Sequence, residues 1–300
     1  MEYPWSPYGS PERFNQGQAL YPNAVAIPDG DSPSTTWLPI YNQRSPYDEN
    51  EIVDLINEIV RDFVRLSSVS ESEVIWPPEG GHNLDESLCN SLNIDISETA
   101  KSLIRRLPDP ATTQPETILL YGSSSLFTIT NSYDLSGSRE APPCSDPNLQ
   151  YLLPHEVQLA IGETQSTAII LDTNENTIRV VSLTEGADEV NPPWVSLERP
   201  EDTFYYRNYW PRHAPTWLRV QSNKIKCLDT IPPGIHGYTL SYLDYGEEWM
   251  RRKIKHSLEG TYGWPSDFQQ SAWDQDRERV WKEADKEYVK LSRPSVLRFV

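Results

Sequence analysis

A histidine at the end of a glycine-rich segment is the first residue whose type and setting could do chemistry. His82 follows a Trp-Pro-Pro-Glu-Gly-Gly segment at residues 76–81, and Asp85 and Glu86 come just beyond it. An imidazole that a carboxylate orients can act as a general base, or as a ligand at the mouth of a pocket. A turn histidine more often bonds to backbone at a helix start, and we favour this structural role.

A second histidine stands directly before an acid. His155 and Glu156 follow Leu153 and Pro154, and they could line the same cleft as His82. A histidine and a carboxylate facing a common cleft would supply a general base and its orienting partner. His82, His155 and Glu156 are therefore our candidates for catalytic residues, although a structural role is favoured here too.

Aromatic residues supply the candidates for binding. Trp264, in a Tyr-Gly-Trp-Pro segment, could stack on a ligand, but such a residue more often locks a helix end onto the core. Residues 204–210 could form a binding platform, because Tyr, Trp and Arg are enriched in interface hot spots. Packing of an edge strand against the core explains this stretch equally well. The binding candidates are Trp76, Trp264, Tyr205, Tyr206, Arg207 and Trp210.

The formal net charge of -18 and the isoelectric point near 4.7 restrict the partners. An acidic surface repels phosphate backbones and anionic lipid, so we expect no membrane partner and consider nucleic acid a poor one. A protein, and in particular a basic one, is the favoured partner. Basic clusters at residues 251–256 and 224–226 could override this locally, but solvated helix faces account for both.

Familiar catalytic and metal-binding motifs are absent from the sequence. There is no phosphate-binding loop, GxGxxG, HExxH or GxSxG, which argues only against enzymes that carry such motifs. The three cysteines, Cys89, Cys144 and Cys227, fit neither a zinc spacing nor a disulfide framework. We therefore expect no metal and no cofactor. The sequence has no signal-peptide pattern and no membrane-spanning run, which favours the cytoplasm, with the nucleus left open.

The candidate residues must be positioned by regular secondary structure. The spacing of apolar residues along the sequence predicts several helices. Residues 1–47 show no regular period and are expected to form an irregular Pro/Tyr-rich arm, whereas residues 48–300 form a single α+β domain. Asp48 caps the first helix, with Glu51 placed as in a capping box and an apolar stripe after it. Further helices are predicted over residues 84–92, 97–107, 214–227, 243–259 and 270–290.

Strands are expected in the middle of the chain. Residues 117–121 and 126–130 flank a turn at residues 122–125, and residues 132–150 form a polar linker or surface loop. The aromatic stretch at residues 204–210 is a candidate for a further strand, because aromatic residues are enriched in strands.

The clearest strand signal is a hairpin. Two runs rich in β-branched residues, 168–172 and 177–183, enclose a polar loop. Asp172 ends the first run, so we expect its carboxylate to bond to the backbone of the turn. The pattern predicts an α+β fold with a central antiparallel sheet flanked by N- and C-terminal helices.

The order of these landmarks resembles that of a class of uncharacterised fungal proteins. The shared features are the Trp-Pro-Pro-Glu-Gly-Gly-His segment at residues 76–82, the Leu-Pro pair at 107–108 that ends a helix, the hairpin, and the Gly-Trp-Pro segment at 263–265. This resemblance extends over about residues 50–270, and it implies no named chemistry.

The hairpin is also similar to that of the SUKH superfamily. The shared features are the Leu-Pro pair at 153–154 and the Leu-Asp pair at 171–172, while the acidic-Gly-Asn-Gly turn usual in that family is absent. The resemblance implies a SUKH-like α+β module that binds other proteins, and a non-catalytic intracellular interaction module is our favoured function. The alternative is a cofactor-free fungal enzyme of secondary metabolism, such as an aminoacyl-tRNA-dependent cyclodipeptide synthase. The acidic charge disfavours tRNA unless the C-terminal helices form a basic groove.

Overall fold

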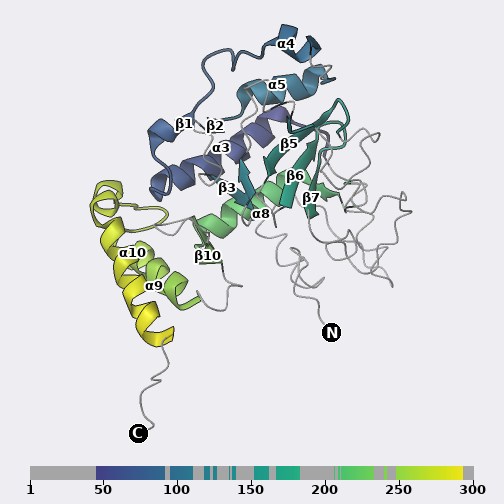
Figure 1. Cartoon of the computed structure of the whole chain (residues 1–300). Coiled ribbons are helices and arrows are strands. Elements are labelled where there is room, and N and C mark those ends of the chain that lie inside the picture. The colour runs from purple at the N-terminus through teal and green to yellow at the C-terminus, as the bar shows by residue number, and fades with distance from the viewer. Residues whose placement is uncertain are drawn as a thin grey trace, which may run out of the picture.

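The structure is a computed structural model of the chain, shown in Figure 1. It describes residues 45–91, 95–110, 118–121, 124–126, 135, 137–139, 152–161, 167–182, 206, 209, 211–232, 240–241 and 248–292. Helices and antiparallel sheets occur together here, so the fold class is α+β, as predicted. Among the described helices, none combines the length and the apolarity needed to cross a membrane. Most of the predicted arm and of the polar linker lies outside the described residues.

The first helix, α3 (Glu49–Arg65), begins where the sequence predicts it. The Asp48 side chain accepts hydrogen bonds from the backbone N–H groups of Asn50 and Glu51 and thereby caps the helix. The Glu51 carboxylate pairs with Arg219 instead of completing the expected capping box. The apolar stripe is buried in the core through Ile52, Ile56, Ile59, Val60 and Phe63.

Two more helices pack with α3 against the main sheet, as Figure 1 shows. The helix α5 (Glu98–Arg106) follows the short α4 (Glu86–Ser91) and starts at the N-cap Ser97. The helix α8 (Ala214–Lys226) has Pro215 in its first turn, where the missing N–H costs no hydrogen bond. The helices α4, α5 and α8 all lie within the ranges that the sequence predicts.

The main sheet has six antiparallel strands, and the predicted hairpin lies within it. Their order is β3 (Leu119–Tyr121), β4 (Ser124–Leu126), β5 (Glu156–Ile161), β6 (Thr167–Asp172), β7 (Thr177–Ser182) and β8 (Arg212–His213). In the β6–β7 hairpin, Asp172 lies opposite Thr177. The turn ends at Asn176 with a φ of 52°, in the left-handed region that Asn tolerates better than most residues.

Two strand predictions need correction. The turn expected at residues 122–125 is too long, because Ser124 and Ser125 belong to β4, where pairing with β5 outweighs the low strand preference of serine. At the two described residues of the 204–210 stretch, the Tyr209 N–H donates to the Tyr206 carbonyl at 3.0 Å, and neither residue belongs to a strand. Both of these tyrosines are fully buried.

The two faces of the sheet pack against different groups, because successive strand residues point to opposite sides. The face toward α3, α5 and α8 contributes Val157, Leu159, Ile169, Leu171, Ile178 and Val180 to the large core. A second, smaller cluster on the opposite face consists of Leu152, Ala168, Ile170, Val181, Tyr206 and Tyr209.

Two small sheets are separate from the main sheet. The strand β1 (Val74–Ile75), which follows the short helix η1 (Glu71–Glu73), pairs with β2 (Asp109–Pro110). The strand β9 (Thr230–Ile231) pairs with β10 (Leu240–Ser241).

The C-terminal part forms a pair of helices, α9 (Glu248–Gly260) and α10 (Gln270–Ser292). The predicted face of α10 is buried at Trp273, Val280 and Ala284, while the side chains of Tyr288 and Leu291 lie outside the described part. Between the helices, Gly263 has a φ of 73°, and a Cβ there would lie 2.5 Å from the Asp267 carbonyl oxygen. A glycine is required at this position because of that close approach.

The basic residues of α9 stabilise the end of α8. Arg251 donates to the Leu228 carbonyl at 3.0 Å and Lys255 donates to the Cys227 carbonyl. Arg251 is 4% exposed, so the solvated face expected for this cluster is wrong at that residue. Cations beside the last carbonyls of a helix are favoured by its dipole and satisfy its free acceptors.

Candidate functional site

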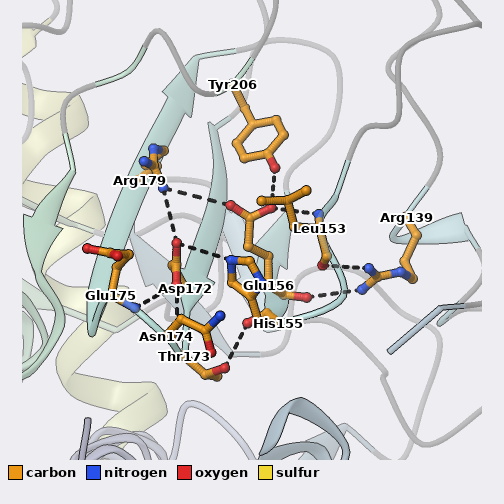
Figure 2. Close-up of polar contacts among 10 residues, drawn as sticks. All are labelled: Arg139, Leu153, His155, Glu156, Asp172, Thr173, Asn174, Glu175, Arg179 and Tyr206. Atoms are coloured by element: carbon orange, nitrogen blue, oxygen red, sulfur yellow. Dashed lines mark hydrogen bonds and ion pairs between the residues drawn. The ribbon is translucent and has the colours of Figure 1, made fainter. Parts of the chain in front are cut away.

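A group of ionisable side chains from three strands lies at the end of the β6–β7 hairpin, on the sheet face away from the helices. Figure 2 shows Glu156 of β5, Asp172 of β6 and Arg179 of β7 converging there, with His155 beside them. We call this group the polar corner. Glu156 and Asp172 meet because they are directly opposite each other in the β5–β6 register.

Glu156 is the centre of the polar corner. The Leu153 N–H donates to its Oε2 at 2.7 Å, and the Tyr206 hydroxyl donates to the same oxygen. Its Oε1 lies 3.8 Å from Arg179 Nη1, and the side chain is 1% exposed. A buried carboxylate is tolerated only when such partners replace its hydration.

Asp172 has one oxygen committed to the turn and one directed at charged neighbours. Its Oδ1 accepts from the backbone N–H groups of Asn174 and Glu175 at 2.9 and 2.8 Å, which confirms the predicted bond to the turn. Its Oδ2 lies 3.6 Å from His155 Nε2 and 3.9 Å from Arg179 Nη1. The contact with Arg179 is an ion pair, and the contact with His155 is one when the imidazole is charged. Both distances exceed hydrogen-bond length.

The backbone of the corner is fixed by two further residues. The Thr173 N–H and hydroxyl both donate to the His155 carbonyl, at 3.1 and 2.9 Å. The Arg139 guanidinium donates to the carbonyls of Leu152, Leu153 and Glu156. Burial lowers the pKa of Arg139, and the nearby Glu156 carboxylate opposes that shift.

A metal ion is the first ligand to test against this geometry. His155, Glu156 and Asp172 each offer one ligand atom, and these atoms lie within 4.8 Å of one another. Imidazole and carboxylate are common ligands of divalent metals. However, the Arg179 guanidinium already brings positive charge to both carboxylates and would repel a cation between them. The residues therefore fit an internal ion-pair cluster better than a metal centre.

His82 lies away from the polar corner. Its N–H donates to the Arg105 carbonyl, near the C-terminus of α5, whereas the Pro154 carbonyl beside His155 accepts from Ser97 at the N-terminus of α5. A helix of this length separates its ends by about 13 Å, at about 1.5 Å a residue. The structure does not bring the two histidines into the common cleft that the sequence suggested.

The contacts of His82 fit its favoured structural role. Its Nε2 lies 3.0 Å from the Leu107 carbonyl oxygen and donates to it, and the residue is 9% exposed. The preceding Gly81 has a φ of 86°, and a Cβ there would lie 2.8 Å from the Arg105 carbonyl oxygen. The glycine thus permits the close approach that seats the histidine.

The two tryptophan candidates that the structure describes both contact other parts of the protein. Trp264 is 4% exposed and its Nε1 donates to the Lys226 carbonyl at 3.0 Å, so it joins the end of α9 to the end of α8. Trp76 is half-buried, and its Nε1 donates to Glu71 at 2.6 Å. Neither indole N–H is left for a ligand.

The remaining binding candidates come from the 204–210 stretch. Tyr206 is fully buried and donates to Glu156, so it belongs to the polar corner and not to a surface platform. Tyr205, Arg207 and Trp210 lie outside the described residues.

Sequence reasoning missed both arginines of the corner. Arg179 interrupts the β-branched run of β7 and is 13% exposed, and a charge inside such a run is a usable signal for a buried partner. Arg139 comes from a polar stretch without a period, so no local pattern could have indicated its role.

Comparisons with known proteins give no match whose site could be compared with this geometry. The SUKH resemblance therefore rests on the sequence features alone. The chain matches no protein-family model, no curated protein and no solved structure.

Proposed function

We propose that this chain is a non-catalytic protein-interaction module of the SUKH-like α+β type. The observation that carries the proposal is that the candidate catalytic groups already have internal partners. His82 donates to a backbone carbonyl, Glu156 accepts two hydrogen bonds, and His155 faces Asp172. A general base needs a lone pair directed at substrate, whereas these groups stabilise the fold around them.

The charge supports a basic protein as the partner. A net charge of -18 raises the encounter rate with a positively charged protein and disfavours nucleic acid. Binding of this kind weakens as the ionic strength rises, because salt screens the attraction between exposed charges.

Affinity capture with the tagged full chain from a fungal lysate tests the proposal. We expect one stoichiometric protein partner, recovered equally by the wild type and by His155→Ala, with a yield that falls as salt is added. The exposed neighbour variant Asn174→Ala serves as the matched control at the same turn. Bound protein, RNA and small molecules are identified together.

The opposite result is equally clear. Enrichment of tRNA or of one defined metabolite, lost in His155→Ala and kept in Asn174→Ala, would replace the interaction module with an enzyme that works at the polar corner.

A further inference from the structure

Ser45 lies where the hairpin, β8 and α8 meet. Its Oγ is 3.1 Å from Nε2 of His213, the residue that ends β8 and is the N-cap of α8. The Asn176 amide donates to the carbonyls of Ser45 and Pro46 at 3.1 and 3.2 Å. Asn176 is buried and Ser45 is exposed, so the backbone is held in place while the hydroxyl stays at the surface.

The imidazole of His213 can adapt to what Ser45 presents. Its Nδ1 lies 2.8 Å from the Thr216 hydroxyl, which can either donate or accept. When the Thr216 hydroxyl donates to Nδ1, the proton of the ring is on Nε2 and is directed at Ser45. In this tautomer His213 can donate from Nε2 to an anionic oxygen carried by Ser45, and the Asn176 amide nitrogen lies 3.5 Å from the same Nε2.

The surroundings favour a negative charge at this point. The His213 side chain does not cap the backbone N–H groups of α8, and the first turn of α8 has no acidic residue. A helix N-terminus carries about half a positive charge. Asp48 is committed to the N-terminus of α3, where its Oδ1 accepts from two backbone N–H groups.

The sequence supplies the reason to look for a modification. Ser45 precedes Pro46, and Ser-Pro is the dipeptide that proline-directed protein kinases recognise. We propose that Ser45 is phosphorylated by such a kinase and that the phosphoryl group docks on His213 at the start of α8. This inference is independent of the proposed function.

The chemical step is an ordinary phosphoryl transfer. The Ser45 Oγ forms a bond to the γ-phosphorus of ATP while the bond from that phosphorus to the leaving ADP oxygen breaks, and the hydroxyl proton goes to the base of the kinase. The product adds a negative charge of about 1.5 to 2 at neutral pH and three strong acceptor oxygens.

The test uses the full chain with ATP, magnesium and a purified proline-directed kinase. Because Ser-Pro also occurs at Ser6, Ser10 and Ser32, these three are changed to Ala in the background chain. We expect one phosphoryl group by intact mass, absent after Ser45→Ala. Hydrogen exchange of the first-turn amides of α8 should then slow about two- to fivefold, the effect of an anion at a helix N-terminus.

The matched variant His213→Phe separates modification from docking. It should accept the phosphoryl group on Ser45 and show no slowing of exchange in α8. A peptide of residues 40–50 controls for kinase activity. The proposal is overturned if the chain or the peptide is not phosphorylated on Ser45, or if exchange in α8 does not respond to the modification.

Discussion

The two faces of the main sheet are both buried, but different forces hold them. The face toward α3, α5 and α8 is packed with aliphatic side chains such as Leu171 and Ile178, which are fully buried. The opposite face combines a small cluster of aliphatic and tyrosine side chains with the polar corner of Glu156, Asp172 and Arg179.

This difference predicts which substitutions each face of the sheet tolerates. Apolar packing is non-directional, so a side chain of similar volume can replace another at modest cost. The polar corner is directional, since each buried group is stable only while its partners remain. Substitutions of equal size should therefore be accepted on the helix face and rejected at the corner.

Removal of the Glu156 carboxylate should have the largest effect. Glu156→Ala strips acceptors from Leu153 and Tyr206 and leaves Arg179 with a weaker counter-charge, which should cost about 3–5 kcal/mol of unfolding free energy. Glu156→Gln keeps the shape and one acceptor and should cost about 1–3 kcal/mol. Urea denaturation measures both. A loss below about 1 kcal/mol for Glu156→Ala would remove the contrast between the faces.

A change of volume on the helix face should come next. Leu171→Ala leaves a cavity in the large core and should cost about 2–5 kcal/mol, whereas Leu171→Met keeps most of the volume and should cost less than about 1.5 kcal/mol. The same denaturation series gives the two values. If the methionine variant were as unstable as the alanine variant, this face would be as exacting as the corner.

The turn bond of Asp172 should contribute less. Asp172→Ala leaves the Asn174 and Glu175 N–H groups without their acceptor and should cost about 1–2 kcal/mol. Asp172→Asn keeps an oxygen for the same N–H groups and should recover about half of that loss. Equal losses for the two variants would show that the charge toward Arg179 matters and the turn bond does not.

The smallest effect is expected at a buried acid of α3, on the helix side of the comparison. Asp62 of α3 is buried and its Oδ2 has no hydrogen-bond partner, unlike the acids of the corner. Burial raises the pKa of its carboxyl, and Arg65 opposes that shift. Because a raised pKa favours the protonated form, the contribution to stability is complete below the unfolded pKa of about 3.9 and is lost as the pH rises through the folded pKa.

Asp62→Asn should therefore raise the unfolding free energy at pH 7 and change little near pH 3. Thermal unfolding at both pH values measures this, with the exposed Asp54→Asn on the same helix as the control. A variant that is less stable than the wild type at pH 7 would mean that the ion pair with Arg65 outweighs the cost of burial.

Much of the fold could be predicted because its signals are local. The Asp48 cap, the ranges of α5 and α8, the β6–β7 hairpin and the Asp172 turn bond all depend on residues within a few positions of one another. The polar stretch before Arg139 and the aromatic stretch at 204–210 carry no such period. In the first stretch no role was predicted for Arg139. In the second, Tyr206 and Tyr209 do not lie in the strand that was predicted.

The sequence could identify some members of the candidate site but not the contacts between them. His155, Glu156 and Asp172 stand out by residue type. The charge of Arg179 inside a β-branched run signals a buried partner without identifying it, and no local pattern indicates Tyr206. The assignment of Tyr206 to a binding platform followed from composition, whereas the fold buries it against Glu156.

The sequence by itself determined the helices, the hairpin and the caps, because hydrogen bonds and periodicity within a few residues specify them. Only the tertiary structure decided which groups meet. The Tyr206–Glu156 bond spans 50 positions, the His82–Leu107 bond spans 25 and the Arg251–Leu228 bond spans 23. Contacts over such separations form only once the core has packed, since burial brings the chain segments together and then makes each unpaired polar group costly.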